Sequence, residues 1–254
     1  MKKQAFNPYL PSWEYIPDGE PYVFGDRVYL YGSHDRVGCG YFCDYKLKVW
    51  SAPLSDLNNW QCHGTSFQTR DTANHASNTP WTDHELYAPD CVEKDGKYYL
   101  YMYIVGALGC VGVSDHPEGP FELLSRYEYR PGNEGDEGIF NDVGVLVDDD
   151  GRVYCYYGFE HSHMNEINPE NMYEILDGSL KEPVIDDRSC IPEEIRFYEA
   201  SSPRKINGLY YLIYSPRKGS RLAYATSESP TGPFTYRGLS LIHISEPTRQ
   251  EAIS

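Results

Sequence analysis

Four acidic residues stand at nearly the same distance ahead of four tyrosines that belong to a repeated phrase. Carboxylates that gather in a partly dry cleft raise one another's pKa, and such a group supplies a proton donor beside a proton acceptor. The pairs are Asp18 and Tyr29, 11 residues apart, Asp90 and Tyr99, 9 apart, Asp142 and Tyr154, 12 apart, and Glu199 and Tyr211, 12 apart.

Two of these acids also have ordinary structural explanations. Asp18 lies in a Pro-Asp-Gly turn, where Asp is a frequent turn former, and Asp90 after Ala-Pro is explained equally well as a structural hydrogen-bond acceptor. Asp142 and Glu199 are flanked by apolar strand residues, and burying a lone carboxylate is costly without a partner or a task. The shared place in the repeat makes the four acids candidates as a group.

The repeated phrase itself predicts the elements that position the acids. It reads GDRVYLYGS at residues 25–33, DGKYYLYMY at 95–103, DGRVYCYYGF at 150–159 and NGLYYLIYS at 207–215. Asp-Gly or Asn-Gly supplies the positive-φ positions of a tight hairpin turn, and the Tyr-rich run that follows is typical of a buried strand. The aligned tyrosines are 70, 55 and 57 residues apart, which is the length of a four-stranded propeller blade with its loops.

A second phrase supplies the third and fourth strands of each blade. It occurs at residues 49–60, 111–121 and 223–234, and residues 172–185 are expected to do the same job in the third copy. We therefore predict an all-β propeller with blades at about 15–67, 85–130, 138–187 and 195–238, because a sandwich of two sheets has no reason to repeat a phrase at this period. The first strand of each blade lines the central axis, so the four acids should converge at one end.

Composition excludes several classes of partner. The chain has 254 residues and a formal charge of −16, with no basic run that could release counterions, so we expect no nucleic-acid or membrane partner. Its 24 Tyr, 22 Gly and 18 Pro favour many short strands, and its seven cysteines include no CxxC pair. No signal peptide or membrane span is visible, so a cytoplasmic location is expected.

The segments around these acids resemble glycoside hydrolase family 43, whose members are five-bladed propellers that include β-xylosidases, α-L-arabinofuranosidases and arabinanases. The matching phrases are NPYLPSWEYIPDGEPYVFGDRVYLYGSHD, LYAPD, NDVGVLVDDDGRVYCYYG and EASSPRKINGLYYLIYS. The resemblance covers most of residues 7–238, and the IPDGEP and EASS phrases lie nearer to the xylosidase and arabinofuranosidase members. It implies a catalytic domain at residues 1–238 in which about four of the five blades are present.

The resemblance also implies a role for each acid. Asp18 would be the general base, Glu199 the general acid and Asp142 the carboxylate that orients the acid and adjusts its pKa, in an inverting cleavage of a terminal pentose. Val143 departs from the family phrase, which usually has Pro after this Asp, and it could loosen the Asp142 turn. We predict that Trp13, Tyr87, Asp90 and Phe140 contact the sugar, with Asp90 supporting the pocket wall.

Other expectations concern the remainder of the chain. No cofactor is required and no metal site is predicted, because the axial Ca²⁺ of the complete family fold is held from a fifth blade that we expect to be missing. Residues 239–254 lack the Tyr-rich pattern and look like a non-native tail. The sequence leaves open xylose against arabinofuranose, exo against endo action and the oligomeric state. A non-catalytic carbohydrate-binding propeller, an inactive fragment and a protein-interaction scaffold are the alternatives.

Overall fold

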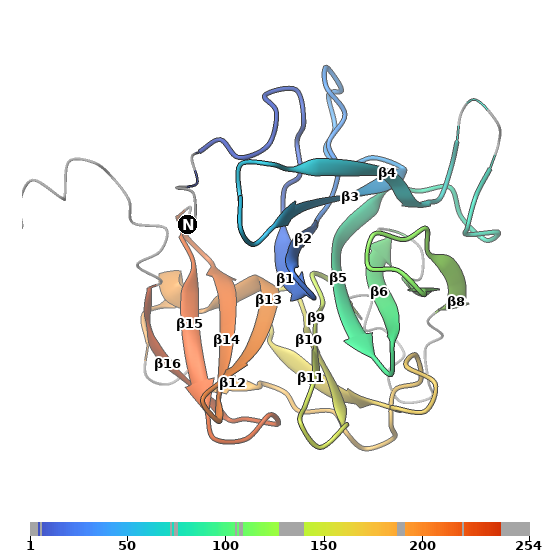
Figure 1. The fold of residues 1–254 in the computed structure, drawn as a ribbon. Coiled ribbons are helices and arrows are strands. Elements are labelled where there is room, and N and C mark those ends of the chain that lie inside the picture. The colour runs from blue at the N-terminus through green and yellow to red at the C-terminus, as the bar shows by residue number, and fades with distance from the viewer. Residues whose placement is uncertain are drawn as a thin grey trace, which may run out of the picture.

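A computed structural model describes residues 5, 7–71, 73, 76–104, 106, 109–126, 140–186, 191–219 and 221–239. Strands dominate these residues, and their one helix is a 3₁₀ turn, η1 (Glu193–Ile195). Figure 1 shows the strands as four sheets set around a common centre, with β1, β5, β9 and β13 innermost. The predicted all-β propeller arrangement with four blades is confirmed.

The first four strands of each blade, or three in the third blade, come from one continuous stretch of chain and run outward from the centre in chain order. The first blade comprises β1 (Glu20–Phe24), β2 (Arg27–Tyr31), β3 (Lys46–Pro53) and β4 (Gln61–Gln68). The second comprises β5 (Leu86–Lys94), β6 (Lys97–Ile104), β7 (Cys110–Ser114) and β8 (Glu122–Arg126). The third comprises β9 (Gly144–Val147), β10 (Val153–Tyr157) and β11 (His163–Ile167), and the fourth β13 (Phe197–Ile206), β14 (Leu209–Pro216), β15 (Ala223–Ser227) and β16 (Phe234–Leu239).

The repeated phrase forms the hairpin between the first two strands of each blade. In the second and fourth blades both turn residues have left-handed backbone, with φ of 54° and 77° at Asp95 and Gly96 and of 52° and 80° at Asn207 and Gly208. This is the geometry that a two-residue hairpin turn between twisted strands needs. The positive-φ positions predicted from Asp-Gly and Asn-Gly are therefore present.

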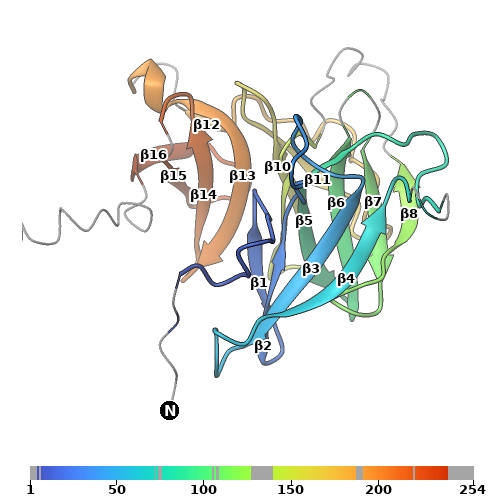
Figure 2. The ribbon, with the colours of Figure 1, turned by 90° about the horizontal axis from the view of Figure 1, so that it is seen from above.

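The Tyr-rich strands are buried because neighbouring blades pack face to face, as Figure 2 shows from above. Three hydrophobic cores fill the spaces between successive blades. Examples of side chains that meet in them are Tyr31 with Leu100, Tyr101 with Val145, and Tyr156 with Leu212. A run that is apolar on both sides is therefore what the second and third blades need, since each of them has a hydrophobic core on both faces.

The third blade differs from the sequence prediction. Its sheet has three strands among the described residues, and residues 172–185 do not supply a third and fourth strand as expected. They make only isolated bridges, Ile175 with Ile167 and Lys181 with Met164. The segment then leaves this blade, and β12 (Ile185–Asp186) pairs in parallel with β16 at the outer edge of the fourth blade. One linker thus ties two blades together.

No helix in the described part of the chain is long and apolar enough to cross a membrane.

Candidate active site

The innermost strands of the four blades share one register. In the second strand of each blade, we take the residue two positions after the aligned tyrosine. Its pairing partner on the innermost strand lies at the same level of the axis in all four blades. These residues are Glu20 opposite Tyr31, Asp90 opposite Tyr101, Gly144 opposite Tyr156, and Ser202 opposite Ile213. The innermost strands also contact their neighbours, β1 with β5, β5 with β9 and β9 with β13. Residues of one level are therefore brought together from different blades.

In every blade, the residue two positions before this level has a left-handed backbone conformation. Asp18 and Asp142 have φ of 55° and 47°, and Ala88 and Ala200 have φ of 33° and 62°. The two alanines lie in matching bulges of β5 and β13, where the register shifts between Tyr87 and Asp90 and between Glu199 and Ser202. Non-glycine residues adopt such backbone at a cost of about 1–3 kcal/mol, and they cluster at functional sites. The bulges re-aim the side chains beside them toward the axis.

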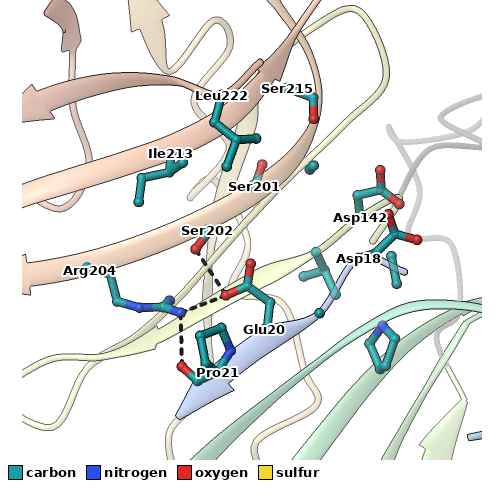
Figure 3. A pocket seen from close by; sticks show the side chains of 15 residues that line it. Asp18, Glu20, Pro21, Asp142, Ser201, Ser202, Arg204, Ile213, Ser215 and Leu222 are labelled. Atoms are coloured by element: carbon teal, nitrogen blue, oxygen red, sulfur yellow. Dashed lines mark hydrogen bonds and ion pairs between the residues drawn. The ribbon is translucent and has the colours of Figure 1, made fainter. Parts of the chain in front are cut away.

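A cavity of about 480 Å³ opens at this end of the axis. It is lined by residues of the first, second and fourth blades and by the segment that leads into the third: Asp18, Gly19, Glu20, Pro21, Ala88, Pro89, Asp142, Val143, Ala200, Ser201, Ser202, Arg204, Ile213, Ser215 and Leu222. In Figure 3 the carboxyl groups of Asp18 and Asp142 lie side by side at one end of this group. Glu199 directly precedes the lining residue Ala200.

Three carboxyl groups at this end repel one another. Burial raises the pKa of Asp142 to about 7, and the charges of Glu199 and Asp18 add to the rise. Burial and the Asp18 charge raise the pKa of Glu199, and burial raises that of Asp18 although Ser33 Oγ donates a hydrogen bond to it at 3.1 Å. Because repulsion acts on both members of a pair, the group holds a shared proton at pH values where isolated carboxyls have lost theirs.

The far side of the cavity holds a partly buried ion pair between the first and fourth blades. Arg204 donates from Nη2 to Glu20 Oε2 at 2.6 Å and from Nη1 to Tyr22 Oη at 3.1 Å. Ser202 Oγ donates to the same Glu20 oxygen at 3.0 Å. Both pairing partners lie within the cavity lining, so the cavity has a polar end that the hydrogen bonds hold in place.

Asp90 lies behind the lining residues and is fully buried. Its Oδ2 accepts hydrogen bonds from Val145 N at 2.6 Å and Tyr22 Oη at 3.1 Å, and its Oδ1 accepts one from Cys91 N at 2.8 Å. Burial raises its pKa to about 7, and the Glu20 charge adds to the rise. The carboxyl therefore links the first three blades, and its supporting role at the pocket wall stays a prediction.

Comparison with known proteins identifies the family to which this chain belongs. The sequence profile of glycosyl hydrolases family 43 matches residues 14–251. The chain belongs to this family. It is 40% identical over 265 residues to a xylosidase/arabinosidase of Thermoclostridium stercorarium, covering 94% of this chain and 53% of that protein. A xylosidase/arabinosidase of Bacteroides ovatus is 32% identical over 289 residues, which cover 96% of this chain and 84% of that protein.

Solved structures of family 43 members share the fold. The enzyme from Xanthomonas citri crystallised with xylose has a TM-score of 0.71 and 26% identity, covering 91% of this chain and 75% of that one. A β-xylosidase/α-arabinofuranosidase from a compost metagenome, in complex with xylotriose, has a TM-score of 0.71 and 26% identity over 92% of this chain and 79% of its own. The chain spans about half of the Thermoclostridium protein and about three quarters of these two.

None of the predicted sugar contacts of this family 43 chain, Trp13, Tyr87, Asp90 and Phe140, is among the cavity-lining residues, so these contacts stay predictions. Tyr87 is buried beside the bulge of β5, and its ring meets Phe42 and Tyr103 edge to face. Trp13 is 61% exposed and packs on Trp50, outside the cavity lining. Phe140 is fully buried in the core between the second and third blades, so its ring has no open face and the geometry gives its predicted sugar contact no support.

The sequence reasoning missed several residues of the site. Glu20, Ser202 and Arg204 line the cavity, and Ser33 binds Asp18. The signal for Glu20 was available, because it stands 9 residues before Tyr29, as Asp90 stands before Tyr99. Cys43 also lies close, since Asp18 and Asp142 add to the burial that raises its pKa to about 12. Its thiol is therefore neutral at physiological pH.

Among the described residues, no three His, Cys, Asp or Glu side chains are grouped so that they could hold a metal ion. The mechanism below is derived without the axial calcium ion that the family resemblance implies.

Proposed function

We propose that this chain removes a terminal pentose, xylose or arabinofuranose, from plant-type oligosaccharides. Membership in family 43 supports a glycosidase, and the relatives are named xylosidase/arabinosidase. Two structural neighbours were crystallised with xylose or xylotriose, which supports a pentose substrate. The observation that carries the proposal is the meeting of three mutually repelling carboxyl groups, from three segments of the chain, beside one cavity.

The proposed reaction is a single displacement with inversion. Asp18 takes a proton from a water molecule that attacks the anomeric carbon, while Glu199 gives a proton to the departing glycosidic oxygen. Water must fit between base and sugar, so the two carboxyl groups of an inverting enzyme stand about 6.5–9.5 Å apart. The origin of Asp18 before β1 and of Glu199 in β13, on separate blades, supports this arrangement.

Asp142 adjusts the acid in this proposal. Its charge repels that of Glu199, so a proton leaves the pair at a higher pH than it would leave either carboxyl alone. Burial and the Asp18 charge also raise the pKa of Glu199, so it keeps its proton to a higher pH than an ordinary Glu. The main alternative, a carbohydrate-binding propeller without catalysis, has no need of a shared proton at this position.

The test compares the chain with its Glu199→Gln variant on aryl β-xylosides and α-L-arabinofuranosides of differing leaving-group pKa. With poor leaving groups we expect the variant to lose about 10²–10⁴-fold in kcat/KM, because proton donation is then required. The loss should shrink for a nitrophenyl leaving group that departs without help. Glu122→Gln on the exposed side of β8 is the control. Near-full turnover by the Glu199 variant on unactivated substrates would refute the assignment.

A wild-type chain that binds xylose but hydrolyses none of these substrates would instead support the carbohydrate-binding alternative. Hydrolysis of only one class of aryl pentoside would identify the sugar.

A further inference from the structure

Glu20 is a second carboxylate of the cavity, and the mechanism above gives it no task. It begins β1 two residues after Asp18, and its side chain lines the cavity with 21% of its surface exposed. Both residues line the one cavity, and in Figure 3 Glu20 lies between Arg204 and the pair of Asp18 and Asp142. A sugar whose anomeric carbon faces Asp18 would therefore reach Glu20 with its other side.

The two oxygens of Glu20 have different surroundings. Oε2 accepts hydrogen bonds from Arg204 at 2.6 Å and from Ser202 at 3.0 Å. Oε1 accepts none from any of the residues that the structure describes, and in Figure 3 both dashed lines to Glu20 end on its other oxygen. The carboxylate is thus held in one orientation by one oxygen, and its other oxygen is left as an acceptor.

The charges of the cavity select the kind of ligand. Its ionisable lining groups are Asp18, Glu20, Asp142 and Arg204. The guanidinium of Arg204 is already engaged by Glu20, Tyr22 and the carbonyl oxygen of Pro203, to which Nη1 donates at 2.7 Å. No cation among these lining groups is left for an anionic ligand, whereas a neutral sugar offers hydroxyl donors to a carboxylate oxygen.

We propose that Glu20 Oε1 accepts a hydrogen bond from a ring hydroxyl of the terminal sugar. Glu20 is then a residue that determines which sugars bind, and Ser202 and Arg204 hold it in position for that contact. The proposal rests on the proposed function, because it assigns a contact to the sugar that Asp18 and Glu199 act on. It also explains why an ion pair borders the cavity, where its carboxylate oxygen is accessible to a ligand.

The test uses Glu20→Gln with aryl glycosides of the preferred pentose in which one hydroxyl at a time is replaced by hydrogen. Arg204 and Ser202 still need an acceptor, so the amide oxygen should face them and the amide nitrogen should face the cavity. A donor then replaces the acceptor, and kcat/KM on the parent substrate should fall about 10- to 100-fold. On the one deoxy substrate that lacks the donating hydroxyl, variant and wild type should agree within about twofold.

An equal loss on the parent and on every deoxy substrate would overturn the proposal, since it would show that Glu20 acts only by positioning the strands. Glu122→Gln is the matched control, and the thermal unfolding midpoint of Glu20→Gln establishes that the variant is folded.

A separate measurement keeps the proposal distinct from the proposed function. If the wild-type chain hydrolyses nothing, binding of free xylose and arabinose is measured by titration of both proteins followed by NMR. Binding that is about 10-fold or more weaker in Glu20→Gln supports the contact even without catalysis. Equal binding by both proteins, or no binding by either, overturns it.

Discussion

At the scale of single residues, the site depends on acidic side chains whose raised pKa values come partly from their closeness to one another. Asp142 has its pKa raised to about 7 because it is buried next to Glu199 and Asp18. Sequence spacing predicted this meeting, since Asp142 and Glu199 each stand 12 residues before their repeat tyrosine and Asp18 stands 11 before its own. The spacing did not predict the order of pKa values, because burial depends on how the turns fold over each carboxyl.

Replacing Asp142 by Asn should change the pH profile in a definite direction. The Asp142 charge makes it harder for Glu199 to lose its proton, so its removal lowers the pKa of Glu199. The alkaline limb of kcat/KM should then move to lower pH, and the maximal rate should fall. Rates on an aryl pentoside from pH 4 to 9 measure this. An alkaline limb that stays in place would contradict the role of Asp142.

Asp90 shows where spacing alone misleads. It stands 9 residues before its tyrosine, and this difference of 3 from Asp142 and Glu199 places it deeper along the axis. Tyr87, which stands 12 before Tyr99, occupies the place in β5 that Glu199 occupies in β13. Each bulge inserts one extra residue into its strand and shifts the pairing register. The sequence did not predict these shifts, because alanine, at Ala88 and at Ala200, is not a residue type that marks a bulge.

At the scale of elements, the third blade approaches the fourth at Gly144. A Cβ atom there would lie 2.1 Å from the carbonyl oxygen of Ser201 and 2.3 Å from Pro203 Cδ. These contacts belong to β13, in the same stretch as Glu199. The close approach of β9 and β13 therefore sets how near Asp142, two residues before Gly144, lies to Glu199.

Gly144→Ala should separate the two strands, because the backbone of Ser201 cannot move aside as a side chain could. We expect a loss of about 1–3 kcal/mol or more in the free energy of unfolding, and a fall in kcat/KM even where the variant remains folded. Urea denaturation and aryl pentoside kinetics measure the two effects. Gly40→Ala, whose Cβ would meet nothing within 4 Å, is the control. Unchanged stability of Gly144→Ala would show that the strands have room to adjust.

At the scale of the whole molecule, hydrogen bonds across the axis join all four blades. Arg204 of the fourth blade holds Glu20 and Tyr22 of the first, Tyr22 donates to Asp90 of the second, and Val145 of the third donates to Asp90. The hydrophobic cores join only successive blades. Of the contacts described, the Arg204 pair directly links the first blade to the fourth.

Arg204→Met should therefore destabilise the fold as a unit. It leaves the partly buried Glu20 carboxylate without its cation. Loss of one partner of a fully buried pair costs about 3–5 kcal/mol, and solvent lowers that cost here. Thermal unfolding should show a lower midpoint, whereas Arg152→Met, which removes an exposed pair with Asp150, should change it little. Equal effects of the two variants would show that the axial pair adds no stability.

The pH dependence of stability follows from the raised pKa of the axial carboxyls. Asp90 has a pKa of about 7 in the folded chain and one near 4 when unfolded, so the folded state holds the proton more tightly. Its contribution is present below the unfolded pKa and is lost as pH rises through about 7. We expect a higher unfolding midpoint at pH 5 than at pH 8, and a smaller difference in Asp90→Asn. The same difference in both proteins would contradict this.

The repeat predicted the blades because each tyrosine run buries apolar side chains against a neighbouring sheet, and in the second and third blades against a sheet on either side. It failed in the third blade, where residues 172–185 have the composition of strands but pair only at Ile175 and Lys181 before β12 crosses to β16. Whether such a segment pairs as a strand depends on its tertiary contacts, here the crossing to the fourth blade, and the local sequence does not predict these contacts.

The left-handed alanines bear on attempts to make the protein more heat-resistant. Ala88 and Ala200 adopt a backbone that glycine adopts without strain, so Ala→Gly at these sites would relieve the folded state. The same substitution adds freedom to the unfolded chain and loosens the bulge that aims Glu199. A search for thermostable variants would therefore do better to leave both alanines alone and to work on the outer strands, where side chains can be changed without moving the acid.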